Sequence, residues 1–268
     1  MKIPIFTGIV TLGLVALSSA SSSYVQNFDA YTTVPGSDVN GQDGWTINNT
    51  SDQYSFVYPT LPGYGNGINL GDASAVTMTP SVSSTVTLSH PYAGQMGGIT
   101  LAFDFAIIDS YAPGFYNRDS FEVSLTSGAT TLLGIMFSPV VATPGDPSLD
   151  VGAWNVNYIS AYGSGTLNLQ YFKNNDYLFL LECVPNGANT DFTLTLTGGN
   201  ALSDTKTLSG LDPASLTDQF NINWANVPGN DFGSNYIALD NLNIVPEPTS
   251  SLLLCLAGMG LVSRRKRA

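Results

Sequence analysis

Basic side chains are scarce in this 268-residue chain, which has 8 Lys and Arg residues against 20 Asp and Glu residues. Most of the basic residues lie at the extreme ends, at Lys2 and in the segment 264–267. Between residues 21 and 245, 3 basic residues stand against 19 acidic ones, a formal net charge of −16. A nucleic-acid-binding protein needs a basic surface that displaces counterions. The composition therefore excludes nucleic acid as a partner.

Cysteine and histidine are also rare. The chain has 2 Cys and 1 His. Cys255 lies in an apolar C-terminal run and Cys183 stands alone in the body, which excludes a disulfide scaffold. His90 precedes Pro91, so we expect it in a turn. It has no obvious partners for a Ser-His-Asp triad or a zinc site, and we expect no catalytic residue of either kind.

Apolar residues alternate with polar ones along most of the body, and no amphipathic helix pattern is visible. The clearest runs are 101–107, 120–126, 167–171 and 192–197. Such alternation puts one face of a strand in a core and the other in water, so Phe103 and Phe121 should point inward. Further strands are expected at 24–29, 54–58, 75–79, 84–88, 131–137, 151–158, 177–183, 204–208, 219–224 and 235–244.

These many short strands, separated by Gly, Pro, Asn and Asp, predict an all-β fold. The unbroken series favours a single antiparallel two-sheet sandwich over 21–245, of the jelly-roll or concanavalin-like type. Aromatic residues make up 11% of the chain, enough to fill its core and to make disorder an unlikely alternative. No fixed repeat is visible, which argues against a propeller or solenoid.

The first twenty residues have the layout of a secretory signal peptide. Lys2 is followed by an apolar run over 3–17 and by a small-residue exit that ends at Ala20. We expect a signal helix over 1–20, cleavage by signal peptidase and a mature chain that begins at Ser21. The alternative is a membrane anchor, which the shortness of the run and its internal proline and glycines disfavour.

The last residues form three parts: a Pro-Glu-Pro motif at 246–248, a hydrophobic segment at 249–263 and a basic cluster at 264–267. The apolar core of this segment, 251–262, would span roughly 18 Å as a helix, against about 30 Å for a bilayer core. The basic cluster would hold its end on the cytoplasmic side. The segment therefore predicts a short helix held only transiently in a membrane.

This tail, 246–268, closely resembles the PEP-CTERM sorting signal of bacterial surface and extracellular-polymer proteins. The matching residues are Pro246, Glu247, Pro248, Arg264, Arg265, Lys266 and Arg267. The resemblance implies processing by exosortase and delivery to the cell surface or extracellular matrix of a polysaccharide-producing bacterium. It implies nothing about the body, and an ordinary short tail anchor is the alternative.

Both ends of the body resemble the first and last strands of carbohydrate-binding-type jelly rolls, at 27–31 with 40–45 and at 236–244. The apolar parity changes within the second segment, which predicts a β-bulge at Asp240-Asn241. Similar modules hold a structural calcium near this place, so the resemblance implies Asp29 and Asp240 as calcium ligands. The alternative is that these aspartates form turns and solubilise the surface.

Tyrosines in Pro- and Gly-rich segments could stack against sugar rings. The candidate glycan-binding residues are Tyr58, Tyr64, Tyr111 and Tyr116, while packing over a sheet edge is the alternative. The three tryptophans stand in strand-like contexts and should lie in the core; they are Trp45, Trp154 and Trp224.

A glycoside-acting enzyme of concanavalin-like fold is the alternative function. Glycosidases need two carboxylates flanking the bond. The body has only two glutamates, Glu122 and Glu182, and the run Asp119-Ser120-Phe121-Glu122 lacks the first acid of the Glu-x-Asp-x-x-Glu pattern that such hydrolases carry. We therefore expect a non-enzymatic body that binds extracellular polysaccharide or serves as a structural coat.

Overall fold

The computed structural model describes residues 23–31, 39–48, 55–58, 67–72, 85–109, 119–140, 152–172, 175–198, 202–225 and 235–246. The expected signal peptide, the tail after Pro246 and the expected strand 75–79 lie outside the described residues. The regular secondary structure of the described residues consists of β-strands alone. None of the described segments forms a helix long and apolar enough to cross a membrane.

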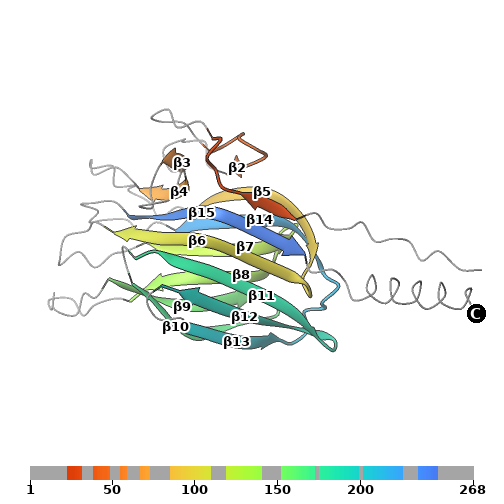
Figure 1. The fold of residues 1–268 in the computed structure, drawn as a ribbon. Helices are drawn as coiled ribbons and strands as arrows, with labels where there is room; N and C mark the ends of the chain where they lie inside the picture. Colours follow the sequence, from red (N-terminus) through yellow and green to blue (C-terminus); the bar gives the residue numbers. More distant parts are fainter. Residues whose placement is uncertain are drawn as a thin grey trace, which may run out of the picture.

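The described strands form two antiparallel sheets that pack face to face (Figure 1). The eight-stranded sheet has the order β13 (Leu202–Leu208), β12 (Asn189–Thr197), β11 (Tyr177–Asn186), β6 (Ile99–Asp109), β15 (Asn235–Pro246), β4 (Gly67–Asp72) and β3 (Ser55–Tyr58), and β1 (Tyr24–Gln26) also pairs with β15. The seven-stranded sheet has the order β10 (Gly163–Phe172), β9 (Ala153–Ser160), β8 (Thr130–Pro139), β7 (Ser120–Ser127), β14 (Leu216–Ala225), β5 (Thr85–Gln95) and β2 (Thr46–Ile47). The prediction of an all-β, two-sheet sandwich is confirmed.

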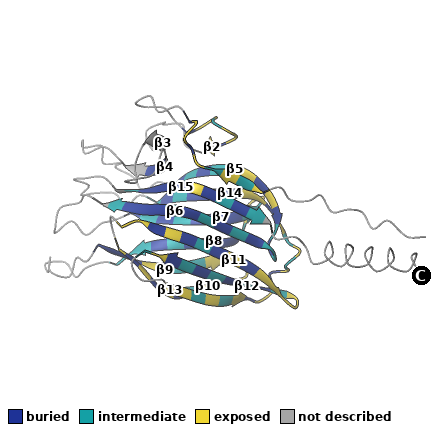
Figure 2. Ribbon diagram, in the orientation of Figure 1, coloured by how far each residue is buried: buried dark blue, intermediate teal, exposed yellow. Residues whose placement is uncertain are grey.

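The core lies between the sheets and is rich in aromatic side chains. Buried and exposed residues alternate along the strands, as Figure 2 shows. Phe103 and Phe121 are buried, as expected, and the Phe103 ring stacks on Phe179 with 4.4 Å between ring centroids. All three tryptophans are fully buried. Burying each phenylalanine, leucine, isoleucine or valine side chain contributes about 1.5–3 kcal/mol, so this core supplies most of the driving force for folding.

The expectation of a turn at His90-Pro91 is wrong, because both residues lie inside β5. Pro91 is opposite Gln219, beside an irregularity in the pairing of β5 with β14. The short partner β2 pairs only with Ser89 and Leu88. The position of Pro91 thus needs no ladder hydrogen bond on that side, which is where a sheet tolerates proline.

The predicted bulge in the last strand is confirmed. The register of β15 against β6 shifts between Asp240 and Asn243, and Asn241 has a φ of 53°. The shift lets Leu239 and Leu242 both point into the core although they are three residues apart. At the same place the other edge of β15 changes partner from β4 to β1, so the first and last described strands of the body pair side by side.

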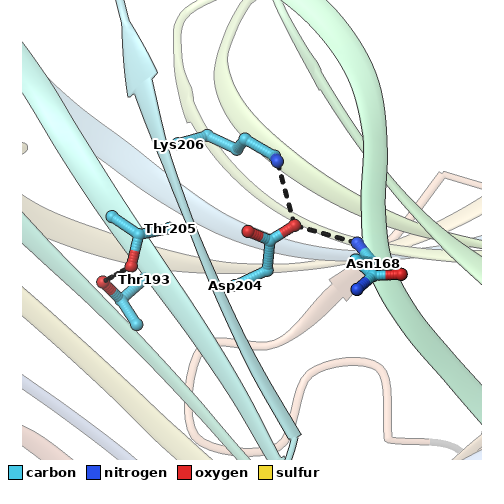
Figure 3. A network of polar contacts seen from close by, with 5 residues as sticks. All are labelled: Asn168, Thr193, Asp204, Thr205 and Lys206. Atoms are coloured by element: carbon cyan, nitrogen blue, oxygen red, sulfur yellow. Dashed lines mark hydrogen bonds and ion pairs between the residues drawn. The ribbon is translucent and has the colours of Figure 1, made fainter.

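The open edges of the two sheets meet at Asp204 (Figure 3). This residue lies on edge strand β13 of the eight-stranded sheet, and its Oδ2 accepts a hydrogen bond of 2.8 Å from the backbone N–H of Asn168 on β10, the edge strand of the other sheet. Lys206 Nζ lies 3.0 Å from the same oxygen. The Asn168 amide and then Lys206 lower the pKa of the Asp204 carboxyl. Asp204 therefore ties the two sheets together at one edge.

We predict that Asp204→Ala lowers the free energy of unfolding by about 1 kcal/mol, because the variant loses a charge-assisted hydrogen bond between the sheets. Lys206→Ala is the matched control. It removes only a partly exposed ion pair and should change stability by less than about 0.5 kcal/mol. Denaturant unfolding of both variants tests this order. An equal or larger loss in Lys206→Ala would show that the ion pair, not the inter-sheet hydrogen bond, stabilises this edge.

Candidate functional site

The outer face of the seven-stranded sheet is lined with amides and hydroxyls. Because Phe121, Val123 and Leu125 of β7 point into the core, the residues between them point outward. Neighbouring strands continue the pattern. The polar side chains of this surface, which we call the amide face, are Glu122, Ser124, Thr126, Ser138, Asn155, Asn157, Gln170, Asn221 and Asn223.

Cross-strand hydrogen bonds hold the centre of the amide face. Asn223 Nδ2 on β14 donates to Glu122 Oε1 at 3.2 Å and to Ser124 Oγ at 3.4 Å on β7. One step along the same strands, Asn221 Nδ2 donates to Thr126 Oγ1 at 3.1 Å. The Oδ1 of Asn221 is buried and has no hydrogen-bond partner among the described residues. Asn221 and Ser124 are both buried, so the centre of the amide face is closed to solvent.

Two further pairs extend the amide face toward the sheet edge. Asn157 Nδ2 on β9 donates to Ser138 Oγ on β8 at 3.2 Å, and Gln170 Nε2 on β10 donates to Asn155 Oδ1 at 3.3 Å. These contacts fix the orientation of each amide while leaving further donors and acceptors on it free for other partners. The result is a set of cross-strand hydrogen-bonded pairs on five strands, with Met136 between Glu122 and Asn157 in register.

The carboxyl group of Glu122 lies over Gly134 of β8, which is opposite Ser124 in register, while Met136 is opposite Glu122 itself. A Cβ built on Gly134 would lie 2.7 Å from Glu122 Oε1, so any other residue there would displace the carboxyl group. Burial raises the pKa of Glu122, and hydrogen bonds from Ser124 and Asn223 partly oppose this rise. Glu122 does lie on the outer side of its strand, but it is half-buried rather than freely solvated.

The other acids of interest do not join Glu122. Glu182 is exposed on β11, between buried Leu181 and Cys183, and therefore lies on the outer face of the opposite sheet. Asp119 is buried and accepts hydrogen bonds from two core tryptophans, at 2.7 Å from Trp224 Nε1 to its Oδ2 and at 3.0 Å from Trp154 Nε1 to its backbone oxygen. These acids thus form no carboxylate pair with Glu122 across a shared bond.

His90 points into the core, away from the amide face. Its ring stacks on Tyr24 with 4.1 Å between centroids, and its Nε2 lies 2.8 Å from the backbone oxygen of Asp43, to which it donates. Burial lowers the pKa of His90. The Asp43 carboxylate accepts from Tyr24 at 3.1 Å and from Gln26 at 3.0 Å. This contact fastens β1 to the segment before β2.

The tyrosines expected to bind glycans are not placed by the described structure. Tyr64, Tyr111 and Tyr116 lie outside the described residues, and Tyr58 ends β3, where only the backbone is described. Their role stays a prediction, as does that of the tail residues after Pro246. The amide face is not among the sites expected from the sequence, since aromatic residues were the candidates for sugar binding. The available signal was the repeated Asn-x-Asn spacing at 155–157 and 221–223.

Of the two expected calcium ligands, Asp240 is buried at the bulge and lies opposite Asp104 of β6. Asp240 Oδ1 accepts from the Asn241 backbone N–H at 2.7 Å, and Asn241 Nδ2 donates to Asp104 Oδ2 at 2.8 Å. Burial, and then the charges of Asp29 and Asp104, raise the pKa of Asp240 to about 6. Nowhere in the described ranges, however, do three or more His, Cys, Asp or Glu residues come together in a group able to hold a metal ion. Calcium at Asp29 and Asp240 therefore stays a prediction.

Solved structures of the same fold include proteins with glycan-related names. The CBM2 module of the evolved Dit of Lactobacillus casei BL23 phage J-1 is 13% identical, with a TM-score of 0.52 over 84% of this chain and 96% of that chain. The PL-14 alginate lyase from Aplysia kurodai is 9% identical, with a TM-score of 0.51 over 85% of this chain and 100% of that chain. At these identities the likeness shows a shared fold. No protein-family model matches the sequence, and no curated protein does.

We predict that Asp240→Asn raises the melting temperature at pH 7.5 in the presence of chelator. The pKa of Asp240 is about 6 in the folded state, above its value of about 3.9 in the unfolded state. The stability that this group contributes is therefore full below about pH 4 and is lost as the pH rises through about 6. The gain in the variant should therefore shrink as the pH falls toward 4. Scanning calorimetry across this range measures it.

Calcium provides the second arm of the same experiment. If Asp240 binds calcium, the ion should raise the melting temperature of the wild type by mass action and have little effect on Asp240→Asn. A variant that is less stable than the wild type at pH 7.5 with chelator present would contradict the account of Asp240 as a buried carboxyl group whose ionisation destabilises the fold.

Proposed function

We propose that this chain is an exported, non-enzymatic glycan-binding protein of the bacterial surface or extracellular matrix, and that it binds polysaccharide with the amide face. The observation that carries the proposal is the array of hydrogen-bonded amides and hydroxyls across β7, β8, β9, β10 and β14. The shared fold with a carbohydrate-binding module and an alginate lyase supports a glycan as the ligand.

The chemistry of the amide face suits a sugar chain. Carboxamides donate and accept at once, as sugar hydroxyls do, and each can pair with two neighbouring hydroxyls. The cross-strand bonds of Asn157 and Asn223 hold their side chains in place before any ligand arrives, which reduces the entropy lost on binding. Outward side chains also repeat at regular intervals along each extended strand, as sugar units do along a linear polysaccharide. The face therefore fits a hydroxyl-bearing polymer better than a compact apolar ligand.

A glycan-acting enzyme is the second candidate, favoured by the raised pKa of Glu122 and by the fold shared with a lyase. Hydrolysis would need a second carboxylate within about 9.5 Å. Asp218 is the next acid on β14, five residues from the partner of Glu122 in register, about 16 Å along the strand. It accepts instead from Gly128 N–H at 2.7 Å. Within the described part of the chain Glu122 thus lacks the second carboxylate that hydrolysis needs, and we propose binding without turnover as the function.

We further propose that the two ends of the chain deliver the body. Residues 1–20 direct export, and exosortase processes the tail 246–268. The position of the Pro-Glu-Pro motif supports this proposal. β15 ends at Pro246, and the expected sorting signal therefore begins where the sheet ends. The body can thus fold completely while the tail is still held in a membrane.

Affinity gel electrophoresis of the full-length chain in mild detergent, with polysaccharides cast into the gel, tests the binding function. We expect at least one polysaccharide to retard the wild type, and the double variant Asn157→Ala/Asn223→Ala to lose most of that retardation, because each amide contributes hydrogen bonds worth roughly 1 kcal/mol. Thr195→Ala, on the outer face of the other sheet, is the control and should migrate as the wild type does. Equal retardation of the double variant would remove the amide face from binding.

The sorting function is tested in a host that carries exosortase. We predict that Glu247→Ala, or deletion of residues 264–267, leaves the body folded but prevents its delivery to the cell surface. Intact-mass measurement of wild-type surface protein should show the hydrophobic segment and the basic cluster missing. Recovery of the full tail from correctly localised protein would favour an ordinary anchor.

A further inference from the structure

Positive charge is almost absent from the described surface. Lys206 is the one basic residue within the described ranges, and its Nζ is paired with Asp204 at 3.0 Å on edge strand β13. The other basic residues of the body, Arg118 and Lys173, lie outside the described residues. An acidic polymer is bound through Arg and Lys, which offer charged donors to its carboxylates. The amide face offers none.

The groups on the amide face are matched to hydroxyls. A carboxylate only accepts hydrogen bonds, whereas a hydroxyl also donates. Glu122 Oε1 accepts from Asn223 Nδ2, and a carboxylate can accept further hydrogen bonds. A sugar hydroxyl can donate to it, whereas an ionised carboxylate cannot. Glu122 also places a carboxyl group at the centre of the face, where a second carboxylate would be repelled.

We propose that the amide face selects neutral, hydroxyl-rich polysaccharides and rejects chains of uronic acids. This inference rests on the proposed glycan binding and names its substrate class. It separates the chain from its lyase neighbour, with which it shares the fold at 9% identity. The net charge of −16 over residues 21–245 acts in the same direction, because it repels any polyanion that approaches.

The experiment compares dextran and galactomannan, which are neutral, with alginate and polygalacturonate, which are uronate chains. The full-length chain is run in affinity gels with chelator, at about 20 mM and about 500 mM NaCl, because screening separates charge effects from neutral hydrogen bonding. We expect at least one neutral polymer to bind at least tenfold more tightly than either uronate, with similar affinity at both salt concentrations. Binding of alginate or polygalacturonate as tight as that of the neutral polymers would overturn the inference.

Glu122→Gln tests the role of the carboxyl group. Removing its charge should raise the ratio of uronate to neutral affinity by about threefold to tenfold at low salt, as expected for losing a like-charge contact at the surface. An unchanged ratio would overturn this part of the proposal. Chitosan, a cationic polymer, supplies one more outcome: tighter binding than the neutral chains, lost at high salt, would show that net charge and not the amides determines selection.

The same gels distinguish failure of this inference from failure of the proposed function. If Asn157→Ala/Asn223→Ala abolishes binding of a uronate polymer, the amide face binds glycans but the neutral selectivity is wrong. If uronate binding survives in that variant and is lost in Arg118→Ala/Lys173→Ala, both the inference and the amide-face function are overturned. Loss of neutral binding in the amide variant, with no uronate binding in the wild type, supports both.

Discussion

The alternation of inward and outward side chains in β7 and β14 is the constraint on which the rest of the structure depends. These neighbouring strands place Phe121 and Trp224 in the core and, one residue away, Glu122 and Asn223 on the surface. A shift of one residue would bury the charged and amide groups and expose the aromatic ones. Burying those polar groups without partners would cost several kcal/mol. The core and the amide face are therefore specified by the same register.

β15 has the corresponding role in the eight-stranded sheet. It pairs with β6 along its length, and its bulge at Asp240-Asn241 divides its other edge between β4 and β1. The bulge keeps apolar residues facing the core on both sides of the change of partner. It also brings Tyr24 opposite Ile244, close to where the chain leaves the sheet at Pro246. The body is thus closed by its own two ends before the tail begins.

Much of this fold follows from local patterns in the sequence. Period-two alternation identifies most strands and the inward side chains, and the parity change between Leu239 and Leu242 is enough to predict the bulge. The turn expected at His90-Pro91 is wrong because proline usually ends a strand. Only the pairing of β5 shows that the N–H that Pro91 lacks is not needed there. Pairings such as Asp204 with Asn168 join distant segments, and no local pattern specifies them.

The amide face could be foreseen only in part. Alternating Asn, Ser and Thr are equally expected on a surface that only contacts solvent. The sequence alone therefore does not distinguish a ligand-binding face from such a surface. Contacts between neighbouring strands distinguish it. Asn223 donates a hydrogen bond to Glu122, and Gly134 leaves room for the carboxyl group of Glu122. Both relations depend on which strands are neighbours, which is decided by the non-local assembly of the sheet and not by any segment alone.

The most direct test of glycan binding by the amide face is amide NMR of the deuterated full-length chain, titrated with a neutral oligosaccharide. The account predicts that the side-chain NH₂ signals of Asn157, Gln170 and Asn223 shift, together with backbone amides of β7, β8, β9 and β14. Shifts confined to the outer face of the other sheet, around Thr193 and Thr205, would contradict it.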